Sequence, residues 1–147
     1  MKKAVCGAIA LACMFATSAF AVDNVTTNNA PDLASVRAKL KSKDYQGALA
    51  ELTPKLQTYQ HADVYNLMGF SLRKTGDRKQ AYTFYRKALD FDPGHKGALE
   101  YLGELYVETG QIDKARENVA QLKQLCPGGC EELADLEQTI AAVSKTN

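Results

Sequence analysis

A pattern of 34 residues occurs twice between residues 62 and 129, and this repetition restricts the fold more than any other feature of the chain. Six positions are identical when the two copies are shifted by 34 residues. They are Gly69/Gly103, Thr75/Thr109, Gly76/Gly110, Ala81/Ala115, Pro93/Pro127 and Gly94/Gly128. A repeat of this length is one supersecondary unit, which buries its apolar face only by stacking on a neighbouring copy. The sequence therefore predicts a stack of similar units.

Each copy has the residue spacing of two successive helices. Tyr65, Met68 and Leu72 recur at the spacing of one helix face. Gly76 stands where the first helix must stop and turn, and Pro93 stands where the second must stop. No strand pattern competes with this interpretation. The expected helices lie near residues 62–74, 78–90, 96–108 and 112–125.

Gly69 and Gly103 lie inside the apolar stripe of the first helix of each copy. Glycine in a helix interior costs about 1 kcal/mol relative to alanine, so its presence needs a packing reason. We expect a close helix contact at both positions, with Ala81 and Ala115 as the matching small residues on the second helices.

The two copies resemble the tetratricopeptide repeat, whose W-x2-L-G-x2-Y, A-x3-F and P spacing they follow. The resemblance extends in weaker form to residues 32–60, where Lys43 takes the place of the turn glycine and Pro54 interrupts the helical pattern. It implies an all-α fold, a right-handed α-solenoid of about three helical hairpins. The domain spans residues 32–147, and its repeats lie at about residues 32–60, 62–95 and 96–129.

A last helix is expected near residues 130–143. One of its faces is apolar and the other carries mostly charged side chains. The apolar residues are Leu133, Leu136, Ile140 and Val143. Such a helix is typical of a cap that shields the end of a solenoid.

The N-terminus predicts export. Lys2 and Lys3 precede an apolar run from Ala4 to Phe15, and the small-x-small triplet Ala19-Phe20-Ala21 follows. This is the pattern of a secretory signal peptide, residues 1–21, because the apolar run is shorter than the roughly 20 residues that span a membrane. Residues 22–31 are then a flexible leader. We expect a periplasmic protein without stable membrane insertion after signal cleavage.

Charge and motifs argue against several classes of function. The formal net charge of the 147 residues is +1, and no basic stripe occurs, so nucleic acid is not an expected partner. The two histidines, His61 and His95, precede the two repeats and are interpreted as solvated loop residues. Phosphate-binding loops and catalytic metal or serine motifs are missing from the sequence. We expect a protein that is not an enzyme and has no cofactor.

Cys126 and Cys130 flank a Pro-Gly-Gly turn between the last repeat and the cap helix. In an exported protein this pair is expected to form a structural disulfide. Copper(I) favours soft sulfur ligands, so a metal or redox accessory protein that uses the same pair is the alternative. The spacing is not the Cys-x-x-Cys of thioredoxin-like redox proteins.

In tetratricopeptide proteins the first helices of successive hairpins line a groove that receives an extended peptide or a partner helix. The resemblance therefore implies partner-binding residues on the corresponding faces. They are Asn66, Phe70, Arg73, Lys74, Glu100, Glu104 and Glu108, with Tyr101 or Tyr106 as a further apolar anchor. The chain also resembles small exported bacterial proteins of this family that end in a Cys-Pro-x-x-Cys turn, which implies an adaptor of the cell envelope.

Glu100, Glu104 and Glu108 form an acidic stripe with four-residue spacing. Like charges at this spacing destabilise a helix by about 0.2–0.5 kcal/mol per pair. Two interpretations remain open. The stripe is either a docking surface for a basic segment of a partner, or a solvated face whose acids pair with Arg73, Lys74 or Arg78 of the neighbouring hairpin.

Overall fold

The computed structural model describes residues 31–145, and within this range the chain forms helices and no strands. The helices are α1 (Ala34–Lys41), α2 (Tyr45–Thr58), α3 (Ala62–Lys74), α4 (Arg78–Phe91), α5 (Lys96–Glu108), α6 (Ile112–Leu125) and α7 (Glu131–Ser144). The expected signal peptide and almost all of the expected leader lie outside the described residues.

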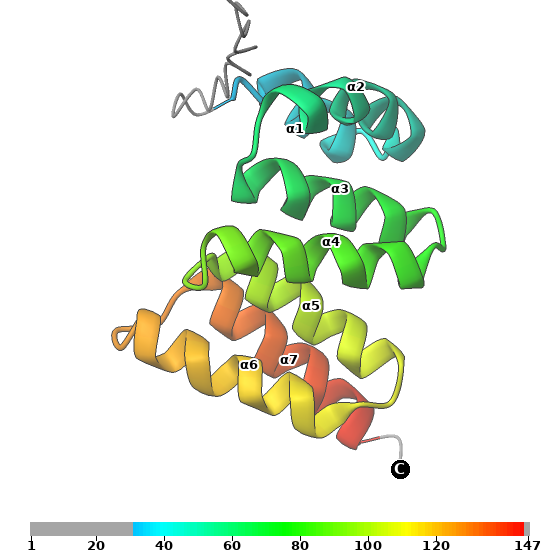
Figure 1. Ribbon diagram of the computed structural model, residues 1–147. Helices are drawn as coiled ribbons and strands as arrows, with labels where there is room; N and C mark the ends of the chain where they lie inside the picture. The colour runs from blue at the N-terminus through cyan, green and yellow to red at the C-terminus, as the bar shows by residue number, and fades with distance from the viewer. Residues whose placement is uncertain (1–30, 146–147) are drawn as a thin grey trace, which may run out of the picture.

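The helices stack as successive antiparallel hairpins, α1 with α2, α3 with α4, and α5 with α6 (Figure 1). Neighbouring hairpins meet where α2 packs on α3 and where α4 packs on α5. The last helix, α7, packs on both α5 and α6. The predicted all-α solenoid of three hairpins with a terminal cap is confirmed, and the observed helix bounds lie within one residue of the expected ones from α3 to α7.

The turn inside each hairpin has the same hydrogen bonds, although its sequence differs. In each turn one amide donates to a carbonyl five residues earlier: Asp44 to Lys39, Asp77 to Leu72 and Gln111 to Tyr106. Such a bond is typical of a helix end in which the residue before the donating amide has a left-handed backbone. Gly76 has φ +97° and Gly110 φ +75°, whereas the first hairpin uses Lys43 with φ 63°. The degenerate hairpin thus keeps the turn with a residue that is strained in that conformation.

Pro54 lies inside α2 and does not end the helix, which continues to Thr58. The proline removes the amide that would bond to the carbonyl of Ala50. Both residues are exposed, so water can satisfy that carbonyl and the helix tolerates the proline.

The two helix glycines permit close packing, as expected. A Cβ atom on Gly69 would lie 2.7 Å from the ring of Tyr85 and 3.2 Å from the main-chain oxygen of Ala81 on α4. On Gly103 it would lie 2.5 Å from the Leu136 side chain of α7. In the last repeat the nearest neighbour of the glycine is therefore the cap helix rather than Ala115.

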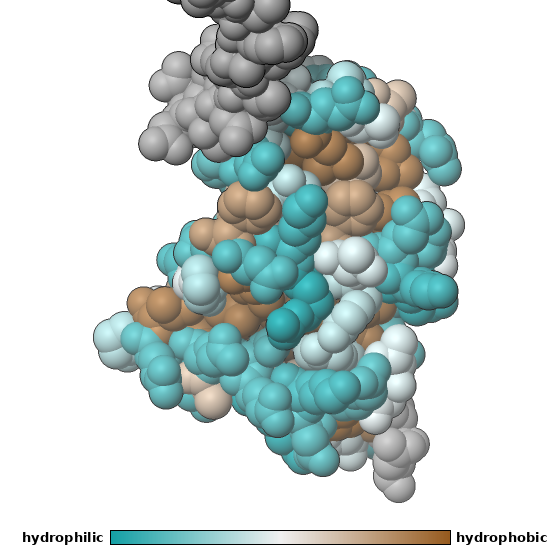
Figure 2. All heavy atoms as spheres, in the orientation of Figure 1, coloured by the Kyte–Doolittle hydropathy of each residue, from teal (hydrophilic) through white to brown (hydrophobic). Residues whose placement is uncertain are grey.

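The apolar stripe of α7 completes the core. Leu133 and Leu136 are buried against Leu99 and Leu122, while Ile140 and Val143 are partly buried beside them. The face in view in Figure 2 is largely hydrophilic, with apolar side chains exposed in separate patches. Between residues 31 and 145, no helix has the length and apolar character needed to cross a bilayer.

Candidate partner-binding groove

The predicted site residues lie on α3 and α5, the first helices of the second and third hairpins, which contact each other. Asn66, Phe70, Arg73 and Lys74 belong to α3, and Glu100, Glu104 and Glu108 belong to α5. The structure brings these residues together in three groups. One is an ion-pair cluster around a buried arginine, one is an aromatic pocket and one is a polar pocket.

The ion-pair cluster surrounds Arg73, whose side chain is only 3% exposed. Its guanidinium donates to the Glu104 carboxylate and lies 3.8 Å from that of Glu108. Arg78 donates to Glu108 from the other side at 3.2 Å. Two glutamates of the acidic stripe are therefore neutralised by arginines of the preceding hairpin, as the solvated-face interpretation describes. Lys74 takes no part in this pairing.

The aromatic pocket is built around Phe70 and Tyr101, whose ring centroids are 4.8 Å apart. The ammonium of Lys74 lies 5.2 Å from the centre of the Phe70 ring. The pocket has a volume of about 320 Å³. It is lined by Arg37, Leu40, Lys41, Leu67, Phe70 and Tyr101. Tyr106, the other expected anchor, is instead buried between the second and third hairpins, beside Tyr82 of α4.

The polar pocket adjoins the aromatic one and shares Arg37, Leu67 and Tyr101 with it. Its volume is about 300 Å³, and its walls come from the first helices α1, α3 and α5 and from the cap helix α7. The remaining lining residues are Asp63, Asn66, His95, Gly97, Glu100, Glu131, Glu132 and Asp135. Of these, the sequence singled out Asn66 and Glu100 as partner-binding residues. The carboxyls of α7 were not among the predicted residues.

His61 and His95 were expected to be solvated loop residues, but both cap helices. The Nδ1 atom of His61 accepts from the amide of Asp63 at 3.2 Å, and that of His95 accepts from the amide of Ala98 at 3.0 Å. Because Nδ1 of His95 is an acceptor, its proton lies on Nε2, which donates to Asp63 at 3.0 Å. This bond lowers the pKa of Asp63. Both histidines stand directly before the first helix of a repeat, and this shared position could have indicated their role as helix caps.

Glu100 is buried at the wall of the polar pocket, with 7% of its surface exposed. Burial raises its pKa to about 8, and the negative charges of Glu104, Asp135 and Glu132 add to this effect. Unlike Glu104 and Glu108, it forms no ion pair within the described part of the chain. The three glutamates of the stripe therefore occupy two different environments.

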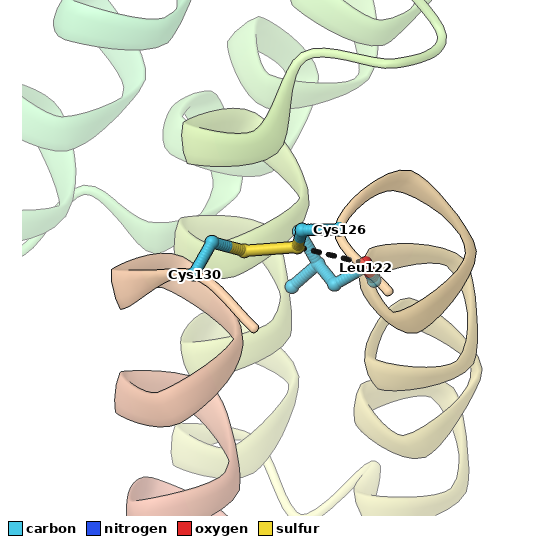
Figure 3. The surroundings of a disulfide bond; sticks show 3 residues. All are labelled: Leu122, Cys126 and Cys130. Atoms are coloured by element: carbon cyan, nitrogen blue, oxygen red, sulfur yellow. Dashed lines mark hydrogen bonds between the residues drawn. A yellow bond between two sulfur atoms is a disulfide. The ribbon is translucent and has the colours of Figure 1, made fainter. Parts of the chain in front are cut away.

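Cys126 follows α6 and Cys130 precedes α7, and the structure joins their sulfur atoms in a disulfide (Figure 3). The bond ties the last hairpin to the cap helix. The sulfur of Cys126 also lies 2.9 Å from the main-chain oxygen of Leu122. Across residues 31–145, the structure contains no group of three or more His, Cys, Asp or Glu side chains arranged to hold a metal ion.

Stacked helical hairpins, first helices that share a hollowed face, and a terminal cap define an α-helical repeat protein. Residues 72–138 match the family model described as tetratricopeptide repeat. The match covers the end of α3, all of α4, the third hairpin and part of the cap helix, so the expected repeat family is supported over the region that carries Arg73 and the acidic stripe.

Similar proteins agree with this fold. The crystal structure of PcrH in complex with the chaperone binding region of PopD superimposes with a TM-score of 0.65 at 14% identity, and the match covers 77% of this chain and 88% of that chain. Over 54 residues, the chain is 37% identical to uncharacterized protein ycf37 of Porphyra purpurea and 35% identical to that of Pyropia yezoensis. Each of these matches covers 37% of this chain, and 31% and 30% of the relatives, so the chain spans about a third of their length.

Proposed function

We propose that this protein is a non-catalytic adaptor that binds a segment of another protein in the groove formed by α1, α3, α5 and α7. The observation that carries the proposal is a pair of adjoining pockets, an aromatic one on α1, α3 and α5 and a polar one that also includes α7. An apolar pocket gives affinity and neighbouring polar groups fix orientation, as is usual in binding sites. The complex of PcrH with a region of PopD supports a peptide-like occupant, because that protein has a similar fold.

The proposed partner segment places one apolar side chain against the rings of Phe70 and Tyr101, which contact each other. The rings are only partly buried in the free protein, so a partner side chain there removes apolar surface from water. Leu40 of α1 and Leu67 of α3 complete the pocket walls. The segment therefore crosses more than one hairpin, and the first, degenerate hairpin is part of the binding surface.

The proposed place of action is the cell envelope, after export through the signal peptide of residues 1–21. In that oxidising compartment the bond between Cys126 and Cys130 acts as a structural clamp on the cap helix. Fractionation of cells that produce the full chain tests this location. Recovery of the protein in the cytoplasmic fraction alone, at its full unprocessed mass, contradicts it.

Site-specific photo-crosslinking tests the groove. A photoreactive amino acid replaces Lys41, an exposed residue at the edge of the aromatic pocket, and in a matched control it replaces Thr83, an exposed residue of α4. We expect the Lys41 position to cross-link a defined partner segment in cells, which mass spectrometry identifies. Introducing Phe70→Ser into the same variant should abolish this product. Equal yields at Lys41 and Thr83, or a product that Phe70→Ser does not change, contradict a groove-bound partner.

A further inference from the structure

The polar pocket contains more carboxyl groups than cationic groups. The cation among its lining residues is Arg37, which lies 3.5 Å from Asp63, and the neutral His95 donates to the same acid at 3.0 Å. Four other carboxyls line the pocket and have no cation beside them among residues 31–145. They are Glu100, Glu131, Glu132 and Asp135. The free pocket therefore contains more hydrogen-bond acceptors than hydrogen-bond donors.

One of the lining residues has a buried polar atom without a partner, which an exposed acidic cluster does not explain. Asn66 is 5% exposed, and its side-chain oxygen has no hydrogen-bond partner in the described structure. Glu100 beside it is 7% exposed and forms no ion pair among the described residues, and its carboxyl oxygens remain open to the pocket. A buried polar group without a partner costs about 1–3 kcal/mol. The protein retains this cost at Asn66, on the wall of the pocket.

The raised pKa of Glu100 agrees with a missing cation. Burial and the nearby charges of Glu104, Asp135 and Glu132 favour its neutral form. A positive group held in the pocket would favour the carboxylate and would also reduce the repulsion among the acids of α5 and α7.

We infer that the polar pocket binds the guanidinium or ammonium group of a basic side chain that belongs to the partner segment. The carboxylates of Glu100, Glu132 and Asp135 and the side-chain oxygen of Asn66 accept its hydrogen bonds. The aromatic pocket, which shares three lining residues with the polar one, takes an apolar side chain of the same segment. The inference rests on the proposed function and adds the chemistry of the partner, a basic residue next to an apolar one.

The acids proposed to bind the basic side chain are not the three glutamates of the acidic stripe. Glu104 and Glu108 are occupied by Arg73 and Arg78. Only Glu100 of the stripe faces the pocket, and its companions come from α7. The cap helix therefore shields the end of the core and also completes the binding site.

Two short peptides that differ only in charge test the inference. N-acetyl-leucyl-arginine amide is titrated into the purified chain, alongside the citrulline counterpart, which keeps the shape of arginine without its charge. Both residue orders are used, because the direction of the segment is not fixed. The signals of the Asn66 side-chain amide are followed by NMR. We expect the arginine peptide to shift these signals and to bind about tenfold more tightly than the citrulline peptide.

The matched variants are Glu100→Gln and Glu117→Gln, the second on the exposed face of α6 away from the pocket. Glu100→Gln should weaken arginine-peptide binding by about tenfold, and Glu117→Gln should leave it unchanged. Equal affinity for the two peptides, or no shift up to about 10 mM peptide, overturns the inference. So do equal shifts with calcium chloride alone at the same concentrations, because the pocket is then a metal-ion site. Any of these results with an intact Lys41 cross-link leaves the adaptor proposal standing.

Discussion

The guanidinium of Arg73 on α3 donates a hydrogen bond to the carboxylate of Glu104 on α5, and this bond links two successive hairpins. The arginine side chain is almost entirely buried, and it also lies over the rings of Phe70 and Tyr101 at 5.9 Å and 5.8 Å. A charge buried to this degree depends on its partner. Arg73 therefore joins the two hairpins and also packs on both rings of the aromatic pocket.

Replacing Glu104 with glutamine should destabilise the fold. The change removes the negative charge closest to Arg73 and leaves Glu108, at 3.8 Å, as its remaining acid. We expect the free energy of unfolding to fall by about 2–3 kcal/mol, which urea denaturation measures. Glu108→Gln, on a side chain that is 37% exposed, should cost less than about 1 kcal/mol. Equal effects of the two changes would falsify the special role of Glu104.

Because Glu104 pairs with Arg73, replacing all three glutamates of the stripe together does not measure their effect on partner binding alone. A loss of partner binding in such a variant would also reflect the loss of the Arg73 contact. The single change Glu100→Gln separates the two effects, because Glu100 has no cation partner within residues 31–145.

Glu100 should make the stability of the protein depend on pH. Its folded-state pKa of about 8 lies above the ordinary value of 4.5, so between these values the folded chain holds a proton that the unfolded chain has released. Stability from this residue is therefore present below pH 4.5 and is lost as the pH rises to about 8. Glu100→Gln should raise the free energy of unfolding at high pH by about 1–2 kcal/mol, less than the full shift because the pocket is open to solvent.

Urea unfolding of the wild type and of Glu100→Gln at several pH values checks this. Other ionisable groups contribute equally to both proteins, so the difference between the two curves isolates Glu100. A difference that stays constant from acid to alkaline pH contradicts the assignment.

The features that the sequence predicted well depend on local signals. Gly76 and Gly110 have the left-handed backbone of a helix end, and for this reason the hairpin turns and helix bounds could be placed from residue types alone. The cap helix was predicted because its apolar residues recur on one face. The charged residues around Arg73 were also identified, including both possible roles of the acidic stripe.

The features that were missed depend on how one helix is rotated against another. Asp63 and His95 belong to different hairpins, and the repeat pattern does not say that their side chains meet. Likewise, nothing local to α7 shows that Glu132 and Asp135 face the same pocket as Glu100. The repeat frame offers one indirect signal, because α7 follows α6 as α5 follows α4 and so occupies the position of another first helix.

Lys43→Gly should stabilise the protein. Lysine at φ 63° is in a backbone region that costs an L-residue about 1–2 kcal/mol, and the other two hairpins have glycine at this place. Glycine also gains entropy in the unfolded chain, which opposes the effect. We expect a net gain of about 0.5 kcal/mol in the free energy of unfolding. Lys43→Ala is the matched control, which removes the side chain without relieving the backbone and should give no gain.

The disulfide between Cys126 and Cys130 should add to stability without being required for folding. The bond closes a short loop between α6 and α7, whereas the core contacts of Leu133 and Leu136 hold the cap helix independently. By the chain-entropy model a loop of this size contributes about 2 kcal/mol. We therefore expect Cys126→Ser together with Cys130→Ser to lower the free energy of unfolding by about that amount, with an unchanged helical circular-dichroism spectrum.

The wild type treated with a reducing agent should match the double variant in urea denaturation, which separates loss of the bond from any effect of serine. Mass spectrometry of the chain from the cell envelope gives the thiol state directly. An oxidised pair supports the structural clamp. Two free thiols that bind one copper(I) ion tightly would instead favour the accessory-protein alternative, because the sulfur atoms cannot be bonded to each other and coordinate the metal as thiolates at the same time.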